Sequence, residues 1–467
     1  MSWSREDILL ATDGKILREG KGVVFGDIAT DSGEVVKGSV FVALKGERFD
    51  GHDFLRDAVR RGAACLVVHK RPDFTHLKNA TVIRVRDTLR ALGNLAHYRR
   101  QLIAPKVLAI TGSNGKTTTK EMVAAILERA SIEGKSLRGK VLKTEGNFNN
   151  LVGLPLTLLR LQGKERVAVL ELGTSRPGEI RRLTKIADPD IGLITSVAPA
   201  HLAGLSSLAG VAREKGDLFR SMNPGGLAVV NLDDPWARRL GEGLKGKKIT
   251  YGKRGEVRGE SRKFLGVRGT EFTLRVGGER RCIRLRLSGE HNVANAVGAA
   301  AMAYGLGADL NAVRRGLEAV KPFPMRMALE RWRGIGIIDD SYNANPASME
   351  AALKTLVEIG AGKEKIAILG DMLELGRESG RSHLELGKRV ARYRIDRLYL
   401  LGEQAQQVKE GALLAGMKEE QVIVGKNHRD IAKMVRSRTK RGAWLLFKGS
   451  RGMKMEMVLE ALKEMGE

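Results

Sequence analysis

The chain has 467 residues, 42% of them hydrophobic and 29% charged, which is enough for about three globular domains and too apolar for a disordered chain. Its formal net charge of +27 favours anionic partners such as nucleotides, phosphorylated substrates, nucleic acid or an anionic membrane. Its two cysteines, Cys65 and Cys282, are too few for a disulfide framework or a zinc site and suit a reducing compartment. Neither a signal peptide nor an apolar stretch of ~18 residues is present, so we expect a cytoplasmic protein without a transmembrane segment.

The basic residues are spread through all three thirds of the chain and form no basic tail. Aromatic residues make up only 4%, which leaves few platforms for stacking on single-stranded nucleic acid. No helix-turn-helix, zinc-finger or RNA-recognition signature is found. We therefore interpret the charge as a solvated basic surface that also attracts nucleotides, and expect no specific nucleic-acid partner.

The first expected unit, residues 1–102, is a smaller α/β domain without a phosphate loop. A strand is predicted over 39–44, and the Asp50-Gly51 pair predicts a turn before a helix that ends near Arg61. Polar side chains that converge at strand ends could hold a ligand, although ordinary loop polarity explains the same residues.

The second unit, residues 103–318, opens with a predicted phosphate loop. An apolar strand over 107–110 leads into a glycine turn, and a helical pattern follows over 121–129. Gly112 and Gly115 would let backbone N–H groups approach an anion, Lys116 would add a charge, and the Thr117 hydroxyl could bind Mg²⁺. The full P-loop pattern has one more glycine, where this chain has Ile110, so a plain strand-to-helix connection is the alternative.

Further alternation of strands and helices follows in this unit. Strands are predicted over 166–170, 190–197 and 226–231, and helices over 208–222 and from 289 onward. Between 247 and 288 the hydrophobic period changes to two, which predicts an antiparallel annex on a parallel sheet.

The third unit, residues 319–467, again alternates strand and helix. Strands are predicted near 335–338, 365–369, 397–401, 421–424 and 443–447. The run Asp-Asp-Ser-Tyr-Asn-Ala-Asn-Pro over 339–346 directly follows the first of them. We expect a loop that faces a ligand, although helix capping explains part of the pattern.

Several side chains in the second unit could take part in phosphoryl transfer. Glu171 ends a predicted strand, where ligands bind in open α/β sheets, and with Thr117 it suits one Mg²⁺. His201 could equally be structural, and Lys215 between Glu214 and Asp217 could be a solvated helix lysine. Asn292 and Asn295 could cap and pack a helix or read an adenine edge.

Ten sequence blocks resemble the Mur ligase family across nearly the whole chain. They are TDS, GSVFVALKGERFDGHDF, ITGSNGKTTTK, GNFNNLVGLPLTLL, LELGTSRPGEI, APAHL, GEHNVANA, DDSYNANPASM, LGDMLELG and KGSRGMKME. Members share the shortened phosphate loop, so Ile110 does not count against the resemblance. The Tyr-Asn-Ala-Asn-Pro segment over 342–346 is the most discriminating block, because other Mur ligases have an Asp-Tyr-Ala-His type of sequence there.

The resemblance implies an α/β fold of three domains: an N-terminal domain for the UDP-sugar peptide, a central P-loop-type ATPase domain and a C-terminal Rossmann-like domain. It implies a monomer that uses ATP and Mg²⁺ at two sites, with UDP-N-acetylmuramoyl-tripeptide and D-alanyl-D-alanine as substrates. ATP would phosphorylate the peptide carboxylate, and the dipeptide amine would displace phosphate from the acyl phosphate.

The resemblance also implies roles for individual residues. The nucleotide would contact Gly112, Ser113, Asn114, Gly115, Lys116, Thr117, Thr118, Asn292, Asn295, Arg326 and Asp339 or Asp340. The metal ligands would be Thr117, Glu171, His201 and a Lys215 carbamylated by CO₂. The expected catalytic set is Lys116, Glu171, His201, Lys215 and Arg326. The UDP-sugar peptide would face Thr30, Asp31, Ser32, Lys45, Asp50, Gly51, His52, Asn147, Asn149, Asn150, Thr174, Ser175 and Arg176, and the discriminating block would add Tyr342, Asn343 and Asn345.

Two positions depart from the family pattern. Ser32-Gly33 stands where Ser-Arg is usual, and Met325-Arg326 where Gly-Arg is usual. Alternatives to the dipeptide-adding activity are another amino-acid-adding Mur ligase, a folylpolyglutamate-synthase-like enzyme, or a basic P-loop NTPase that acts on nucleic acid.

Overall fold

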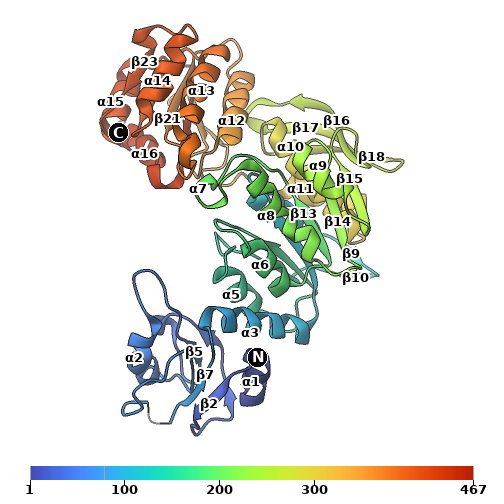
Figure 1. Ribbon diagram of the computed structural model, residues 1–467. Helices are drawn as coiled ribbons and strands as arrows, with labels where there is room; N and C mark the ends of the chain where they lie inside the picture. The colour runs from blue at the N-terminus through green and yellow to red at the C-terminus, as the bar shows by residue number, and fades with distance from the viewer. Residues whose placement is uncertain (1, 78, 466–467) are drawn as a thin grey trace.

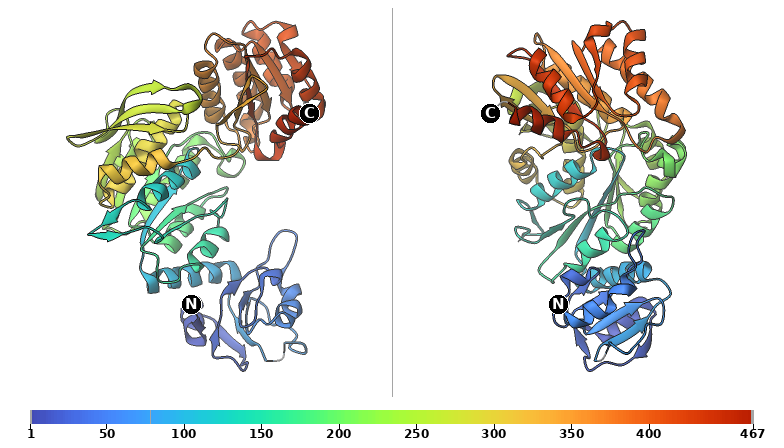
Figure 2. Two further views of the ribbon diagram at one scale, coloured as in Figure 1. Left: turned by 180° about the vertical axis from the view of Figure 1, so that it is seen from behind. Right: turned by 90° about the vertical axis from the view of Figure 1, so that its left-hand side faces the viewer.

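The computed structural model describes residues 2–77 and 79–465. It has a mixed α/β fold of three lobes that follow one another along the chain, each built on its own main sheet (Figure 1). The central lobe lies between the N-terminal and C-terminal lobes in every view (Figure 2). No helix in the described ranges is long and apolar enough to cross a membrane.

The N-terminal lobe contains a five-stranded sheet in the order β2-β7-β6-β5-β4. Strands β4 to β7 run parallel, and β2 pairs antiparallel with β7. The strands are β2 (Lys15–Arg18), β4 (Ile28–Ala29), β5 (Val40–Val42), β6 (Cys65–Val68) and β7 (Thr81–Arg84). A short antiparallel pair, β1 (Trp3–Ser4) and β3 (Val24–Phe25), lies outside this sheet.

Helix α3 (Thr88–Ile103) joins the N-terminal lobe to the central lobe. It packs against α1 (Arg5–Thr12) on one side and against α5 (Gly153–Leu159) and α6 (Glu179–Ala187) on the other. The remaining helix of the first lobe, α2 (Leu55–Arg60), confirms the helix predicted after the Asp50-Gly51 turn.

The central lobe is built on a nine-stranded sheet in the order β11-β12-β8-β13-β14-β15-β16-β17-β18. Its strands are β8 (Lys106–Thr111), β11 (Val141–Lys143), β12 (Val167–Glu171), β13 (Ile191–Ile194), β14 (Leu227–Asn231), β15 (Lys247–Tyr251), β16 (Val257–Phe264), β17 (Thr270–Val276) and β18 (Glu279–Leu285). A separate hairpin is formed by β9 (Ser131–Ile132) and β10 (Lys135–Ser136).

Strand β8 is buried on both faces, because helices cover each side of the sheet. Leu108 and Ile110 belong to the hydrophobic cluster that contains α4 (Lys116–Leu127), α10 (Glu290–Gly305) and α11 (Leu310–Ala319). Val107 and Ala109 belong to the opposite cluster, with α5, α6 and α8 (Leu208–Ser221). A continuous apolar strand is the pattern that a parallel sheet covered on both faces requires.

The antiparallel annex is smaller than the sequence predicts. Strand β15 pairs parallel with β14, so its inclusion in the annex was wrong, and the antiparallel pairs begin between β16 and β17. The polar residues of β15 produced the misleading pattern, because Lys247 and Lys248 at its start are exposed. Helix α9 (Pro235–Glu242) connects β14 to β15.

The C-terminal lobe contains a six-stranded sheet in the order β19-β20-β24-β21-β22-β23. The strands are β19 (Ala328–Trp332), β20 (Ile335–Asp339), β21 (Lys365–Gly370), β22 (Arg397–Leu401), β23 (Val422–Val424) and β24 (Trp444–Lys448). The helices are α12 (Pro346–Ile359), α13 (Ser379–Arg392), α14 (Ala405–Leu414), α15 (His428–Arg438) and α16 (Glu456–Glu464). The five predicted strands are confirmed, and β19, antiparallel to β20, is an addition.

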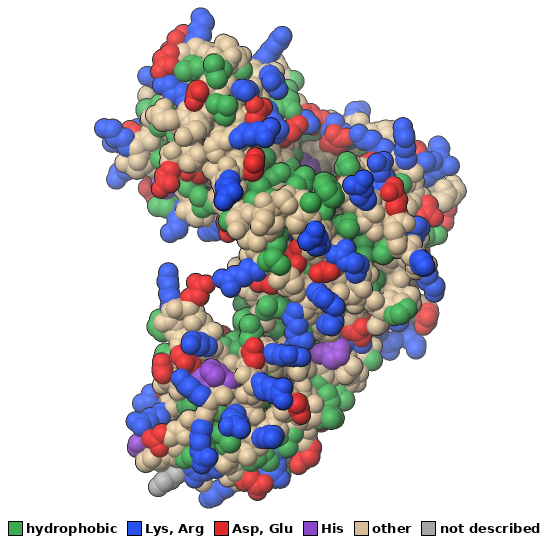
Figure 3. Space-filling view, viewed as in Figure 1, with side chains coloured by type: hydrophobic (Ala, Val, Ile, Leu, Met, Phe, Trp, Pro, Cys, Tyr) green, Lys and Arg blue, Asp and Glu red, His purple; other side chains and the backbone are tan. Residues whose placement is uncertain are grey.

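Basic side chains are distributed over all three lobes on the face seen in Figure 3, interspersed with acidic ones. The same view shows a hollow between the N-terminal lobe and the rest of the molecule.

Candidate active site

The glycine turn after β8 is shaped by close contacts with two neighbouring elements. Gly112 has φ +153°, and a Cβ there would lie 1.8 Å from Thr195 Oγ1 at the end of β13. Gly115 has φ +81°, and a Cβ there would lie 2.3 Å from Asn295 Oδ1 on α10. Both positions therefore require glycine, and the turn ends where the N-terminus of α4 opens, a favourable place for an anion.

Oxygen donors meet beside this turn. The Thr117 hydroxyl donates to Glu171 Oε2 at 2.8 Å, and Asn149 Nδ2 donates to Glu171 Oε1 at 2.8 Å. Glu171 is only 2% exposed, so its carboxylate is held in one orientation by both contacts. A hydroxyl and a carboxylate in contact fit the preference of Mg²⁺ for oxygen ligands.

The described residues contain no group of three His, Cys, Asp or Glu side chains that could hold a metal ion without other ligands. Any Mg²⁺ at Thr117 and Glu171 would therefore take its remaining ligands from water and phosphate oxygens. That is the usual arrangement for magnesium in phosphoryl-transfer sites.

The Lys116 ammonium donates to the Gly112 carbonyl at 2.8 Å and folds back over the turn. Burial lowers the pKa of Lys116; Glu171 opposes this shift, and Arg326 from the C-terminal side of the cavity adds to it. Arg326 lines the same cavity as Lys116 and so adds a second cation to it.

Lys215 is buried at 1% exposure, so the interpretation as a solvated helix lysine was wrong. Its neighbour Glu214 does not neutralise it closely, because that carboxylate accepts the N–H groups of Gly178 and Ile180 at 2.7 Å each. Burial, followed by repulsion from Lys116, lowers the pKa of Lys215 well below its usual value, against the opposing effects of Glu214 and Glu171. An amine that loses its proton readily is one that can react as a nucleophile.

His201 lies at the contact between the central and C-terminal lobes. It has φ +54° and caps α7 (Leu202–Leu205), and its Nδ1 pairs with Glu374 Oε2 of the C-terminal lobe. The Ala203 N–H donates to the Glu374 carbonyl at 3.1 Å, which fastens the same two segments. The hydrogen bond to His201 lowers the pKa of Glu374. With Nδ1 engaged, the other ring nitrogen is the one left for a ligand.

Asn292 and Asn295 lie on the first turns of α10. Asn292 Nδ2 donates to the Ser288 carbonyl at 2.8 Å, so its side chain caps and packs the helix end. Asn295 contacts the phosphate loop at Gly115 and donates only a long 3.3 Å bond to Asn292 Oδ1. Of the two, Asn295 has more hydrogen-bonding capacity left for a ligand.

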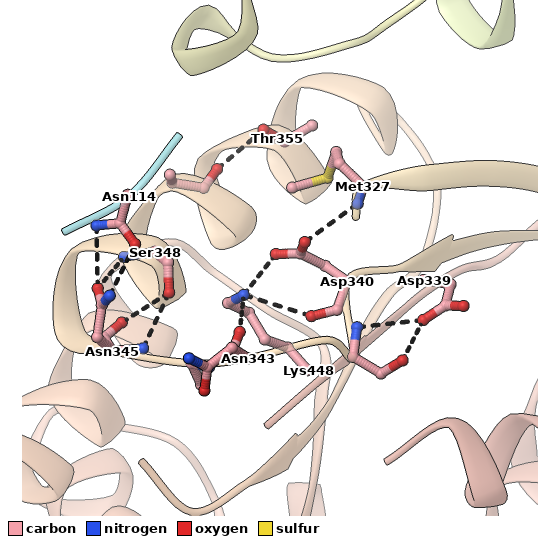
Figure 4. A network of polar contacts seen from close by, with 12 residues as sticks. Asn114, Met327, Asp339, Asp340, Asn343, Asn345, Ser348, Thr355 and Lys448 are labelled. Carbon is pink, nitrogen blue, oxygen red and sulfur yellow. Dashed lines mark hydrogen bonds and ion pairs between the residues drawn. The ribbon is translucent and has the colours of Figure 1, made fainter. Parts of the chain in front are cut away.

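The segment of the C-terminal lobe that follows β20 brings Asn345 against Asn114 of the phosphate loop (Figure 4). Asn345 and Asn114 of the phosphate loop exchange amide hydrogen bonds, and the Arg326 guanidinium lies 3.8 Å from the centre of the Tyr342 ring. Asp340 pairs with the Lys448 ammonium at 2.6 Å. The Asp339 carboxylate instead accepts from Ser341, and burial raises the pKa of Asp339.

A cavity of about 650 Å³ lies between the central and C-terminal lobes. It brings together most of the expected nucleotide and metal residues: Ser113, Asn114, Gly115, Lys116, Thr117, Thr118, Glu171, His201, Lys215, Asn292, Asn295, Arg326 and Asp340. Among the expected substrate residues it is lined by Asn147, Asn149, Asn150, Thr174, Ser175, Tyr342, Asn343 and Asn345. Gly112, Arg176 and Asp339 lie outside its lining.

The expected substrate residues of the N-terminal lobe also lie outside this cavity: Thr30, Asp31, Ser32, Lys45, Asp50, Gly51 and His52. The loop between Lys45 and Asp50 approaches the central lobe, where Glu47 Oε1 lies 3.8 Å from Arg176 Nη2. A substrate that touches both groups must therefore extend across the hollow between the lobes.

His52 is engaged by the protein at both ring nitrogens. Its Nδ1 lies 2.6 Å from Asp50 Oδ1, and its Nε2 accepts the His69 N–H at 3.1 Å. Asp50 also pairs with Lys70 at 2.9 Å. The buried imidazole therefore supports the loop and leaves no ring nitrogen for a substrate.

Two residues at the site were missed by the sequence analysis. Lys448 ends the apolar strand β24, where a lysine after four apolar residues is unusual enough to have been a signal. Glu374 belongs to the site because it contacts His201 of the other lobe, and no local sequence pattern predicts such a contact.

The order of the central sheet and the glycine turn after its β8 strand define a P-loop-type nucleotide-binding fold. The chain matches three family models: "Mur ligase family, catalytic domain" over residues 26–100, "Mur ligase middle domain" over 110–303 and "Mur ligase, glutamate ligase domain" over 325–451.

Curated relatives and solved structures agree with these models. The chain is 36% identical over 468 residues to the UDP-N-acetylmuramoyl-tripeptide–D-alanyl-D-alanine ligase of Escherichia coli, with 96% of each chain covered. It is 35% identical to the Bacillus subtilis ligase of the same name, with 94% of this chain and 93% of that one covered.

A crystal structure of MurF from Acinetobacter baumannii has a TM-score of 0.90 at 32% identity, with 99% of both chains covered. MurF from Thermotoga maritima in complex with ADP has a TM-score of 0.82 at 29% identity, with 94% of this chain and 97% of that one covered. The chain belongs to the Mur ligase family.

Proposed function

We propose that this protein is an ATP-dependent ligase that adds D-alanyl-D-alanine to UDP-N-acetylmuramoyl-tripeptide, which forms the pentapeptide precursor of peptidoglycan. The observation that carries the proposal is the contact of Thr117 with Glu171 beside Lys116, in a cavity that Arg326 completes from another lobe. The names of the full-length relatives supply the substrates.

ATP is the nucleotide that this cavity would hold. Backbone N–H groups of the glycine turn and the Lys116 ammonium would bind its phosphates, and Arg326 would add a second positive charge. The Thermotoga maritima relative was solved in complex with ADP, which supports an adenine nucleotide as the ligand of this chain. Asn295 is the candidate for reading the base, since Asn292 is engaged in capping.

Thr117 and Glu171 would hold one Mg²⁺, and His201 with a carbamylated Lys215 would hold a second. Bound Mg²⁺ would neutralise charge on the phosphates of ATP and on the acyl phosphate that forms from the peptide carboxylate. The low pKa of Lys215 supports the carbamate, because only a neutral amine attacks CO₂. The carbamate would exchange a buried cation for an anion that can bind metal.

The acid substrate would extend from the N-terminal lobe to the cavity. The UDP-sugar would bind to the N-terminal lobe, and the peptide carboxylate would reach the cavity past Asn147, Asn149, Asn150, Thr174 and Ser175. An oxygen of that carboxylate attacks the terminal phosphorus of ATP, and ADP leaves. The dipeptide amine then attacks the carbonyl carbon, and inorganic phosphate leaves as the amide forms.

Both nucleotide substrates belong to the cytoplasm, which supports that compartment for the enzyme.

The experiment is an assay of phosphate release and product mass with Mg-ATP, UDP-N-acetylmuramoyl-tripeptide and either D-alanyl-D-alanine or single amino acids. We expect one phosphate to be released for each pentapeptide formed when the dipeptide is the amine substrate, and no turnover with single amino acids. Turnover with a single amino acid but not with the dipeptide would instead assign the protein to another ligase of the family.

A further inference from the structure

Arg326 lies in a linker in which two residues adopt an unfavourable backbone conformation. The linker joins α11 to β19, and the residues on either side of Arg326, Met325 and Met327, have φ values of +57° and +54°. Residues with a Cβ seldom adopt this left-handed conformation, because the Cβ approaches the following carbonyl oxygen. Contacts from elsewhere must therefore hold this linker in place.

Those contacts come from the segment that follows β20. The Met327 N–H donates to Asp340 Oδ1 at 3.1 Å, and the Tyr342 N–H donates to the Met325 carbonyl at 3.0 Å. The Arg326 guanidinium stacks on the Tyr342 ring. The position of Arg326 therefore depends on the conformation of residues 340–343.

Lys448 fixes that conformation from below (Figure 4). The lysine ends β24 and is 2% exposed. Its ammonium donates to Asp340 Oδ2 at 2.6 Å, to the Asn343 carbonyl at 2.8 Å and more weakly to the Asp340 carbonyl at 3.4 Å. One buried cation thus holds both ends of the short segment that contains Tyr342.

The hydrogen bonds of Lys448 indicate a structural role for this side chain. A lysine has three N–H donors, and all three point to protein oxygens here. Asp340 has one carboxylate oxygen on Met327 N–H and the other on Lys448. The pair therefore links the linker to the sheet of the C-terminal lobe.

We propose that Lys448 is a positioning residue, which through Asp340 and Asn343 keeps Arg326 directed at the phosphate loop. The expected change in the KM for ATP rests on the proposed function, whereas the positioning of Arg326 by Lys448 does not. Loss of Lys448 leaves the three lobes and the phosphate loop intact but lets the left-handed linker relax, and Arg326 then no longer keeps its place in the lining of the cavity that also contains Lys116.

The test compares Lys448→Met with the double variant Lys448→Met/Asp340→Asn. The double variant leaves no unpaired buried charge, so it should fold even where the single variant does not. Lys365→Met is the matched control: Lys365 also pairs with an aspartate of this lobe, Asp396, but it begins β21, at the opposite end of the strands from Lys448, and does not line the cavity.

Hydrogen exchange at the Met327 amide is the first measurement, because its N–H donates to Asp340. We expect the Met327 amide to exchange faster than in the wild type in both Lys448 variants and at the wild-type rate in Lys365→Met. The KM for ATP should rise about tenfold or more, as is typical for loss of a residue that orients a ligand-binding group. The KM for the UDP-linked substrate should stay unchanged.

A role limited to stability would lower the active fraction, and thus kcat, without changing the KM for ATP. Wild-type exchange at Met327 together with a wild-type KM for ATP in the double variant would overturn the proposal. Should the wild-type protein fail to ligate the dipeptide while Met327 still exchanges faster in the variants, the proposed function would fail and the positioning role would stand.

Discussion

Asn345 Nδ2 donates to Asn114 Oδ1 at 2.7 Å, and Asn114 Nδ2 donates back to Asn345 Oδ1 at 3.2 Å. This amide pair joins the phosphate loop of the central lobe to the first residue before α12 in the C-terminal lobe. Asn345 also caps α12 by accepting the Ser348 N–H at 2.9 Å. One side chain therefore both caps the N-terminus of a helix and links two lobes across the cavity.

Two substitutions of Asn345 separate these roles. Asn345→Ala removes the cap and the amide pair, and should cost about 1 kcal/mol of stability together with a loss of nucleotide affinity. Asn345→Ser keeps a capping oxygen but is too short to reach Asn114, so affinity should fall with little change in stability. Urea unfolding and calorimetric titration with ADP measure the two effects. Equal nucleotide affinity in Asn345→Ser and wild type would show that the amide pair is not needed.

Lys116→Ala should abolish turnover while the fold is retained. The substitution removes a positive charge from the phosphate loop, and we expect kcat/KM for ATP to fall by about a thousandfold or more. Lys143→Ala is the control, because it removes a partly exposed pairing with Glu121 and neither residue lines the cavity. Phosphate release with saturating substrates checks the prediction, and activity within tenfold of wild type would contradict it.

Lys215→Ala should lose nearly all activity and recover part of it when acetate or propionate is added. The reason is that the proposed missing group is an anion, which a small carboxylate can replace in the space left by the side chain. Arg213→Ala, an exposed position on the same helix, should behave as wild type. The measurement is phosphate release against carboxylate concentration. Full activity of Lys215→Ala without any additive would rule out the carbamate.

The stability of the N-terminal lobe should decrease as the pH falls below about 6.5. Burial lowers the pKa of His52 against the opposing effect of Asp50, so the unfolded chain takes up a proton on this imidazole at a pH where the folded chain does not. Proton uptake by the unfolded state alone favours unfolding. The contribution of a neutral His52 is therefore complete above the ordinary histidine pKa and is lost toward lower pH.

His52→Gln should make the free energy of unfolding less dependent on pH between 7.5 and 5. Urea unfolding of the full chain, followed by circular dichroism, measures this slope. His76→Gln is the control, because that side chain is exposed. An unchanged slope in His52→Gln would mean that His52 binds its proton equally well in both states.

Contiguous patterns allowed the phosphate loop to be predicted residue by residue. Gly112 to Thr117 lie within six positions, and the apolar strand and the helix around them are local features. The strands of the C-terminal lobe were predicted for the same reason. The boundary of the antiparallel annex was not, because the polar start of β15 imitates the alternation of a half-exposed strand.

Side chains whose surroundings come from distant segments could not be judged in this way. Lys215 has two acidic neighbours in the sequence, yet Glu214 turns toward the N-terminus of α6 and the lysine is buried beside the phosphate loop. His52 belongs to a block expected to bind substrate, yet both its ring nitrogens contact the protein. The assigned roles of the individual site residues stay predictions that the experiments above address.

By itself the sequence determined the α/β class, the phosphate loop and the family, because these depend on short-range periodicity and on motifs whose residues are adjacent. Only the tertiary structure decided which side chains are buried, free or engaged, since burial and hydrogen bonding arise when segments distant in the sequence pack together, within a lobe or between lobes. The pairs Asn114 with Asn345, His201 with Glu374 and Asp340 with Lys448 join residues more than a hundred positions apart. The first two pairs join the central and C-terminal lobes, and the third joins the ends of two neighbouring strands of the C-terminal sheet, so no local pattern encodes them.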